Sequence, residues 1–276
     1  MRKAKSTYQQ NENIYRDAPS VFKRTIRFIA AVISNNSVVK RIAAKYPRLF
    51  QFFLNRLTPN RFSGLPFTLL LTATTANLLL LNEITESIEN SPWMLSIDKS
   101  FARFLFSIRI TTIADALLYF TMLGSIRVVI IIALAAIVIF LWKKNFVYLI
   151  ASVIALVGTG ATVLLGKNYF HRIRPTDFGF YSETSFSFPS GHATIAVAFY
   201  GLLFYAVFHH FKRNKIKFLW ITISLSFILL LGFSRLYLGV HYLSDVVAGY
   251  SLGFLWLLLA LSIVEWSTYN KWNSDV

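Results

Sequence analysis

The chain has 276 residues, of which 55% are hydrophobic and only 14% are charged. A soluble domain carries about 25% charged residues, so this composition excludes an ordinary soluble protein and predicts one embedded in a membrane. Cysteine is absent, which excludes a disulfide framework, thiolate chemistry and a cysteine metal site. The formal net charge of +16 is concentrated in residues 1–61, which hold thirteen Lys and Arg against two acidic residues.

This basic N-terminal segment is expected to lie on the cytoplasmic side, near anionic lipid headgroups. A basic arm also suits nucleic acid, but the apolar spans that follow favour the lipid surface, so no nucleic-acid partner is expected. Phe22, Ile26, Ile29 and Ile33 share one helical face, which predicts an amphipathic helix lying on the membrane, although a helix packed on the spans would show the same pattern. The first twenty residues lack an apolar core, so no cleavable signal peptide is expected.

Six apolar segments approach or reach the length of about 20 residues that crosses a bilayer. They lie near residues 64–82, 126–142, 146–166, 192–211, 217–234 and 244–264. Lipid offers the backbone no hydrogen-bond partner, so runs of this kind are expected to be helices. The predicted fold class is therefore all-α, a bundle of six transmembrane helices.

This pattern divides the chain into three parts. They are a basic cytoplasmic or membrane-surface segment at 1–61, a six-span domain at 62–266 and a short cytoplasmic tail at 267–276. Within the domain, residues 98–124 mix charged and apolar residues and are expected to form a second interfacial helix.

The short basic loops predict the orientation, because Lys and Arg near span ends stay in the cytoplasm. Lys143 and Lys144 lie between the second and third spans, and KRNKIK at 212–217 lies between the fourth and fifth. Six spans then place both termini in the cytoplasm, and the alternate loops face outward. Those outward loops are 83–125, 167–191 and 235–243.

Three polar motifs stand at the ends of spans that this topology places outside. They are KNYFHRIRP at 167–175, PSGH at 189–192 and SRLYLGVHYLSD at 234–245. Ionisable residues at the membrane are costly, so function is their first explanation. Each motif alone also has an ordinary explanation. The basic residues of the first, Arg172 among them, would snorkel, Ser190 would cap a helix, and His241 and Asp245 would form an inert pair at i and i+4.

Taken together, the motifs describe a site for a phosphate group. Lys167, Arg174 and Arg235 supply three cations. Ser190 and the amide of Gly191, near the N-terminus of the fourth span, supply hydrogen bonds to an anion. The occurrence of these groups in one order on one side favours a shared phosphate-binding role over separate ordinary roles.

Three further residues supply the chemistry of phosphoryl transfer. His241 can act as a nucleophile through one ring nitrogen while Asp245 holds the other and fixes the tautomer. His192 is then free to protonate the leaving oxygen, a step typically worth about 10²–10⁴-fold. Positioned cations around the transferring group would supply much of the remaining stabilisation.

The combined pattern K-x6-RP, PSGH and SR-x5-H-x3-D resembles the type-2 phosphatidic acid phosphatase family, over about residues 64–264. Its relatives include lipid phosphate phosphatases, undecaprenyl-diphosphate phosphatases and vanadium haloperoxidases. Every motif position is present, namely Lys167, Arg174, Pro175, Pro189, Ser190, Gly191, His192, Ser234, Arg235, His241 and Asp245.

The resemblance implies an integral membrane phosphatase that forms a covalent phosphohistidine, here on His241, and releases it to water. It implies no metal ion or other cofactor, with His192 as the general acid. The implied partners are the lipid bilayer and a lipid phosphate substrate, whose tail stays in the membrane while its head reaches the outer face. The implied location is the cytoplasmic membrane, with a multi-pass chain and an extracytoplasmic site.

Several alternatives remain open on sequence grounds. His192, His241 and Asp245 have the composition of a metal triad, although three nearby cations oppose a divalent ion. A transporter could bind lipid phosphate without cleaving it, a phosphotransferase would differ only in the acceptor, and a haloperoxidase shares the motifs. Nothing separates phosphatidic acid, phosphatidylglycerol phosphate, undecaprenyl diphosphate and lipid A phosphate as substrates, and loop 176–188 is expected to line the entrance.

Overall fold

In a computed structural model of the chain, the described residues are 41, 45, 46, 48, 56 and 64–274. The amphipathic helix expected around Phe22–Ile33 and most of the basic segment 1–61 lie outside the described residues. The chain divides into two compact units, residues 1–71 and 72–276, and the three motifs all belong to the second.

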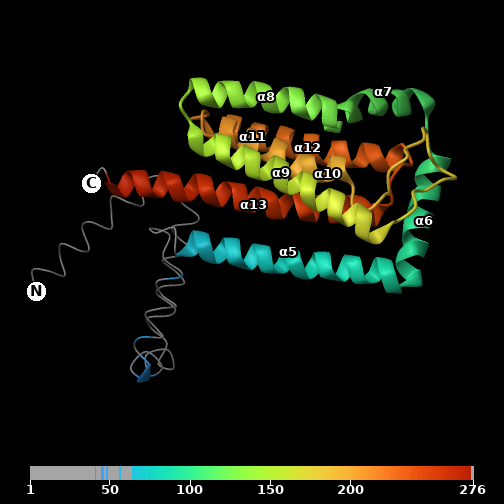
Figure 1. The fold of residues 1–276 in the computed structure, drawn as a ribbon, viewed down its shortest axis with the longest axis horizontal. Helices are drawn as coiled ribbons and strands as arrows, with labels where there is room; N and C mark the ends of the chain where they lie inside the picture. The colour runs from blue at the N-terminus through green and yellow to red at the C-terminus, as the bar shows by residue number, and fades with distance from the viewer. Residues whose placement is uncertain (1–40, 42–44, 47, 49–55, 57–63, 275–276) are drawn as a thin grey trace, which may run out of the picture. The chain divides into compact units, whose positions relative to one another are not determined.

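Every regular element among the described residues is helical, which confirms the predicted all-α class (Figure 1). The elements are α5 (Leu65–Asn90), α6 (Pro92–Ser107), α7 (Thr111–Thr121), the 3₁₀ turn η1 (Met122–Gly124), α8 (Ile126–Trp142), α9 (Phe146–Phe170), α10 (Gly191–Ile195), the π-helical turn η2 (Ala196–Tyr200), α11 (Gly201–Phe208), α12 (Asn214–Tyr237) and α13 (Leu243–Ser274).

Five of the six predicted spans are helices long and apolar enough to cross a membrane. They correspond to α5, α9, the continuous segment α10–η2–α11, α12 and α13. The remaining predicted span, α8, is apolar apart from Arg127 but has only 17 residues. Large apolar side chains such as Ile126, Leu79 and Phe218 stand exposed on these helices. Such a surface is stable in lipid rather than in water.

The segment predicted as an outward loop at 83–125 is instead almost wholly helical. Helix α5 continues beyond the apolar run to Asn90, so the polar residues NEITESIEN at its end are helical as well. The single interfacial helix expected at 98–124 is also wrong in detail, since two helices form there and the chain bends by 118° between α6 and α7. In Figure 1, α6 runs across the bundle at one end, whereas α7 lies in line with α8.

The helical segment that begins at Gly191 lies at the centre of the second unit. Residues 193–200 are all buried, many of them small, so α9 and α13 pack closely around this segment. Two glycines of α13 permit this close approach, because a Cβ at Gly253 would lie 2.4 Å from the Thr194 carbonyl oxygen and one at Gly249 would lie 2.7 Å from that of Ser190. The π-helical turn η2 inside this segment is a feature that often accompanies functional sites.

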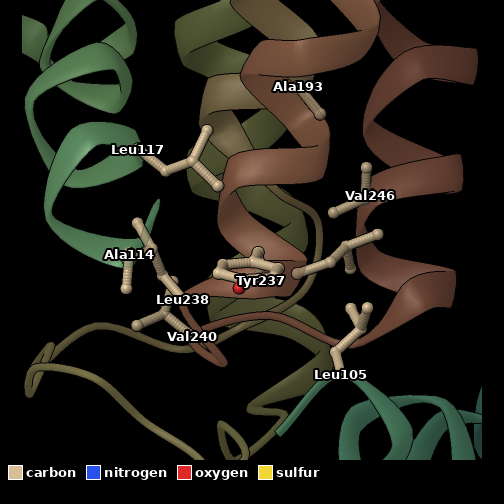
Figure 2. Close-up of a cluster of buried hydrophobic side chains, with 9 residues drawn as sticks. Leu105, Ala114, Leu117, Ala193, Tyr237, Leu238, Val240 and Val246 are labelled. Atoms are coloured by element: carbon tan, nitrogen blue, oxygen red, sulfur yellow. The ribbon is translucent and has the colours of Figure 1, made fainter. Parts of the chain in front are cut away.

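An apolar cluster supports the end of the bundle at which the motifs lie (Figure 2). Leu105 of α6, Leu117 of α7, Tyr237 of α12 and Val246 of α13 all belong to it. The Tyr237 hydroxyl also accepts a hydrogen bond of 2.9 Å from the backbone N–H of Ile110, at the bend between α6 and α7. The cluster therefore ties the crossing helix α6 to the helices that carry the motifs.

Candidate active site

The three sequence motifs meet at the end of the bundle where α6 crosses it (Figure 1). The first motif ends α9, the second begins α10, and the third joins the end of α12 to the start of α13. The basic residues Lys143 and Lys144 lie at the opposite end, where they line a pocket together with Ser267 of α13. The bundle thus separates the site from a basic end, as the topology prediction requires.

Ser190 lies fully buried immediately before α10. Its backbone N–H donates to the Asp245 carbonyl oxygen at 3.0 Å, which joins the start of α10 to the start of α13. Its side chain forms no cap on α10, and its Oγ has no hydrogen-bond partner among the described residues. A buried hydroxyl without a partner is costly, so Ser190 is better suited to a ligand than to a structural cap.

His241 and Asp245 form the pair that the i, i+4 spacing predicts, and both are buried. His241 Nδ1 lies 3.4 Å from Asp245 Oδ2, and the same oxygen accepts a 2.9 Å hydrogen bond from the Tyr242 N–H. Arg174 Nη1 lies 3.0 Å from His241 Nε2. Because a guanidinium can only donate, Nε2 is the acceptor and the ring proton sits on Nδ1, facing Asp245.

Burial lowers the pKa of His241 well below the ordinary histidine value, and the cations of Arg174 and Arg235 lower it further. The imidazole is therefore neutral near pH 7. A neutral ring with no proton on Nε2 has the protonation state that a nucleophile needs.

Arg235 is the most completely buried of the three predicted cations. Its Nη1 donates to Thr121 Oγ1 at 3.2 Å and also to the Tyr181 hydroxyl. Its Nε has no partner among the described residues. The unpaired Nε of Arg235 and the unpaired Oγ of Ser190 are two buried groups that can each donate to an anion.

Glu183 is one residue of this cluster that sequence reasoning missed. It belongs to loop 176–188, whose acidic residues carried no assignment. Its carboxylate forms ion pairs with both arginines, with Oε2 at 2.7 Å from Arg174 Nη2 and Oε1 against Arg235 Nη2. Burial favours the neutral acid, but Arg235 and Arg174 outweigh it and lower the pKa of Glu183 to about 2. A carboxylate thus already lies between two of the predicted phosphate-binding cations.

The same loop satisfies the third cation. Lys167 Nζ donates to Ser185 Oγ at 2.9 Å, and Arg174 Nη2 donates to the same oxygen at 3.0 Å. The Tyr181 hydroxyl donates to Glu183 Oε1 at 2.9 Å. Loop 176–188 therefore contacts all three predicted phosphate-binding cations with its own polar groups.

A second acidic cluster behind His241 was also missed. Arg172, considered only as a membrane-edge residue, donates to Asp245 Oδ1 at 2.5 Å and to Asp98 Oδ2 at 2.6 Å. Both carboxylates oppose the effect of burial and keep the pKa of Arg172 above its ordinary value. Asp98 belongs to α6, 74 residues before its partner, and no local pattern marked it.

His192 lies one residue into α10, and its ring packs against η1. Gly124 makes this contact possible, since a Cβ there would lie 2.5 Å from His192 Cδ2. Among the described residues, no group of three His, Cys, Asp or Glu side chains is arranged to hold a metal ion. The alternative triad of His192, His241 and Asp245 therefore has no support in the geometry.

Comparison with known proteins agrees with the motifs. Residues 145–269 match the PAP2 superfamily. A 100-residue segment is 38% identical to phosphatidylglycerophosphatase B of Bacillus subtilis (strain 168), covering 36% of this chain and 49% of that protein. A 116-residue segment is 35% identical to lipid A 1-phosphatase of Rhizobium etli, covering 38% of this chain and 45% of that protein. The chain thus matches about half the length of these curated relatives.

The fold agrees as well. The crystal structure of a transmembrane PAP2 type phosphatidylglycerolphosphate phosphatase from Bacillus subtilis superposes with a TM-score of 0.63 at 26% identity. The alignment covers 70% of this chain and 96% of that one. The family resemblance inferred from the three motifs is confirmed for residues 145–269, which match the PAP2 superfamily.

Proposed function

We propose that this protein is an integral membrane phosphatase that hydrolyses a phosphomonoester or diphosphate of a membrane lipid. The observation that carries the proposal is the buried imidazole of His241, neutral and with Nε2 facing Arg174, beside Arg235 and the unpaired hydroxyl of Ser190. The names of the relatives support a lipid phosphatase, since they act on a phosphatidylglycerophosphate and on lipid A.

Substrate binding begins with an exchange of anions. The phosphate group takes the position of the Glu183 carboxylate between Arg174 and Arg235. A phosphate dianion brings more charge and more acceptor oxygens than one carboxylate, so it competes well for two guanidinium groups. Arg174 Nη1 turns from His241 Nε2 to a phosphate oxygen, which frees the electron pair on the nitrogen. The Ser190 hydroxyl and the Gly191 amide donate to the remaining oxygens.

The covalent step is an in-line displacement at phosphorus. His241 Nε2 forms the bond to phosphorus while the bond to the lipid oxygen breaks, and His192 gives its proton to that oxygen. Asp245 accepts from Nδ1–H and stabilises the positive charge that develops on the ring. In the second step, a water gives a proton to His192 and attacks phosphorus, the N–P bond breaks, and inorganic phosphate leaves.

The proposed location follows from the ends of the bundle. The site end faces away from the cytoplasm, in the cytoplasmic membrane, because the basic residues Lys143 and Lys144 lie at the other end. Both chain termini are then cytoplasmic. A lipid substrate keeps its tail among the exposed apolar helices while its phosphate reaches the site.

Phosphate release from defined lipids tests the proposal. The purified protein in detergent is offered phosphatidylglycerol phosphate, phosphatidic acid, undecaprenyl diphosphate and lipid A, each with and without EDTA. We expect inorganic phosphate from at least one lipid, with a rate that EDTA leaves unchanged. A labelled phosphate that appears on a second lipid instead of in water would identify a phosphotransferase. Binding of every lipid without cleavage would indicate a transporter, and loss of activity with EDTA would overturn the metal-free mechanism.

A further inference from the structure

The geometry behind His241 assigns a positioning role to Asp98. We propose that the Asp98 carboxylate pairs with Arg172, so that this cation does not fully cancel the charge of Asp245. The charged groups on the Nδ1 side of His241 then carry a net negative charge. The inference rests on the proposed function, in which that charge supports the nucleophile. Asp98 itself does not reach the substrate and acts through Arg172 and Asp245.

Four charged or polar side chains form a continuous buried chain. Asp98 Oδ2 accepts from Arg172 Nη2 at 2.6 Å, Arg172 Nη1 donates to Asp245 Oδ1 at 2.5 Å, and Asp245 Oδ2 faces His241 Nδ1 at 3.4 Å. The side chains of both aspartates have no solvent exposure, and that of Arg172 has 11%. Because these side chains are largely shielded from water, each formal charge acts strongly on its neighbours.

Asp98 changes the net charge of the group of side chains next to His241. With Arg172 as the sole partner of Asp245, the two charges would cancel and the imidazole would face a neutral pair. The carboxylate of Asp98 returns the sum to one negative charge. This net negative charge stabilises the positive charge that develops on the His241 ring during phosphoryl transfer, which a neutral pair would not do.

Asp98 also has a structural role as a helix cap, and the test has to distinguish this role from an effect of its charge. It accepts from the Ser244 N–H at 2.9 Å and from Ser244 Oγ at 2.5 Å, so it caps the first turn of α13. The bond from the Ser244 N–H needs only one acceptor oxygen, which asparagine also provides, whereas the amide NH2 of asparagine cannot accept from Arg172. Burying a charged cap beside a buried ion pair is costly, and this favours a role for the charge itself.

The location of Asp98 adds to the inference. It lies on α6, outside residues 145–269 that match the PAP2 superfamily. The crossing helix therefore contributes to the site a group that the matched domain lacks. The other charged groups that face His241 are Arg174, Arg235 and Lys167, which lower its pKa, and Glu183, which raises it. All of these stay in place in the variants below.

The test compares Asp98→Asn with wild type. The variant keeps an acceptor for the Ser244 N–H and removes the charge together with the oxygen that faces Arg172, so we expect kcat/KM on dioctanoyl phosphatidic acid to fall about tenfold. The imidazolium of His241 loses a stabilising charge, so its pKa falls and the acidic limb of the pH profile moves to lower pH by about half a unit or more. Asp115→Asn on α7, which changes an exposed carboxylate, is the matched control and should leave both unchanged.

A double variant makes the charge argument specific. Asp98→Asn/Arg172→Met removes one negative and one positive charge, so the sum behind His241 returns to that of wild type. We expect the acidic limb to move back toward the wild-type position. Arg172→Met alone leaves both carboxylates and should move the limb to higher pH, the opposite direction, which keeps the test open if Asp98→Asn does not fold.

A proton-NMR titration of the histidines in detergent micelles, with the His241 signal assigned from His241→Gln, reads the same pKa without turnover. Wild-type protein that cleaves no lipid would refute the proposed function, while this titration would still test Asp98. A fall in rate with an unshifted His241 pKa, or a double variant no closer to wild type than Asp98→Asn, would overturn the inference and leave Asp98 as a cap.

Discussion

The two halves of the site are built differently. Ser190, His241 and Asp245 sit at helix ends, are at most 2% exposed, and are held by backbone and buried side-chain contacts. The opposite half is loop 176–188, whose Glu183 side chain is 24% exposed and reaches the arginines without support from a helix. The helical half holds the proposed reacting groups, whereas the loop half contributes the Glu183 carboxylate to Arg174 and Arg235. In the proposed mechanism the nucleophile is therefore held in place before substrate binds, while the position proposed for phosphate is occupied by the Glu183 carboxylate.

The largest effect is expected in the helical half. His241→Ala removes the nucleophile and should lower kcat by about 10³-fold or more for every lipid that wild type cleaves. The measurement is inorganic phosphate release from the purified variant. A residual rate within tenfold of wild type would show that the loop half, and not His241, holds the reacting group.

His192 should have a smaller effect that depends on the leaving group. Loss of a general acid typically costs about 10²–10⁴-fold, and less when the leaving oxygen needs no proton. His192→Ala should therefore retain a larger share of wild-type kcat on an aryl phosphate than on a monoalkyl phosphate. An equal loss on both substrates would refute the assignment of His192 as the acid.

A substitution in the loop half should tighten the binding of anions instead of lowering activity. Glu183→Gln removes the carboxylate that competes with phosphate for Arg174 and Arg235. We expect orthovanadate and inorganic phosphate to inhibit about tenfold more strongly, because the competent site is no longer mostly occupied. Asp177→Asn changes an exposed carboxylate of the same loop and serves as the matched control.

This competition should not vary with pH in the working range. Glu183 has its pKa lowered to about 2, below that of an ordinary glutamate, so it is fully ionised from about pH 4 upward. The ratio of vanadate inhibition constants between wild type and Glu183→Gln should stay constant from about pH 5 to pH 8. A ratio that falls toward one on acidification would mean that Glu183 protonates and is not held by both arginines.

The smallest effect concerns labelling rather than activity. Single cysteines in this cysteine-free chain report the side of the membrane on which each end of the bundle lies. In intact cells an impermeant thiol reagent should label Thr184→Cys, in the loop half, and leave Lys215→Cys unlabelled. The reverse pattern would place the site in the cytoplasm, and activity of each variant is measured to confirm that it is folded.

Much of the fold and of the helical half could be predicted because the signals are local in sequence. Apolar runs located the spans, and the i, i+4 spacing paired His241 with Asp245. The helical extension of α5 to Asn90 could not be predicted, because its residues are polar and hydropathy does not distinguish polar helix from loop. The bend between α6 and α7 depends on tertiary contacts such as Ile110 with Tyr237.

The missed site residues depend on contacts between distant parts of the chain. Glu183 acquires its role only where a loop folds back onto Arg235, 52 residues later. Asp98 meets Ser244 across 146 residues of sequence. A lone acidic residue in a loop or on a crossing helix has no spacing that predicts such a partner, so only the folded chain shows it.

The most direct measurement is the trapping of the covalent intermediate. Wild-type protein is mixed with a ³²P-labelled lipid that it cleaves, quenched within milliseconds, and digested to locate the label. We expect an acid-labile, base-stable phosphoryl group on the peptide that contains His241, and no label in His241→Ala. Rapid turnover by wild type without label on that peptide, or label that persists in His241→Ala, would contradict the phosphohistidine mechanism.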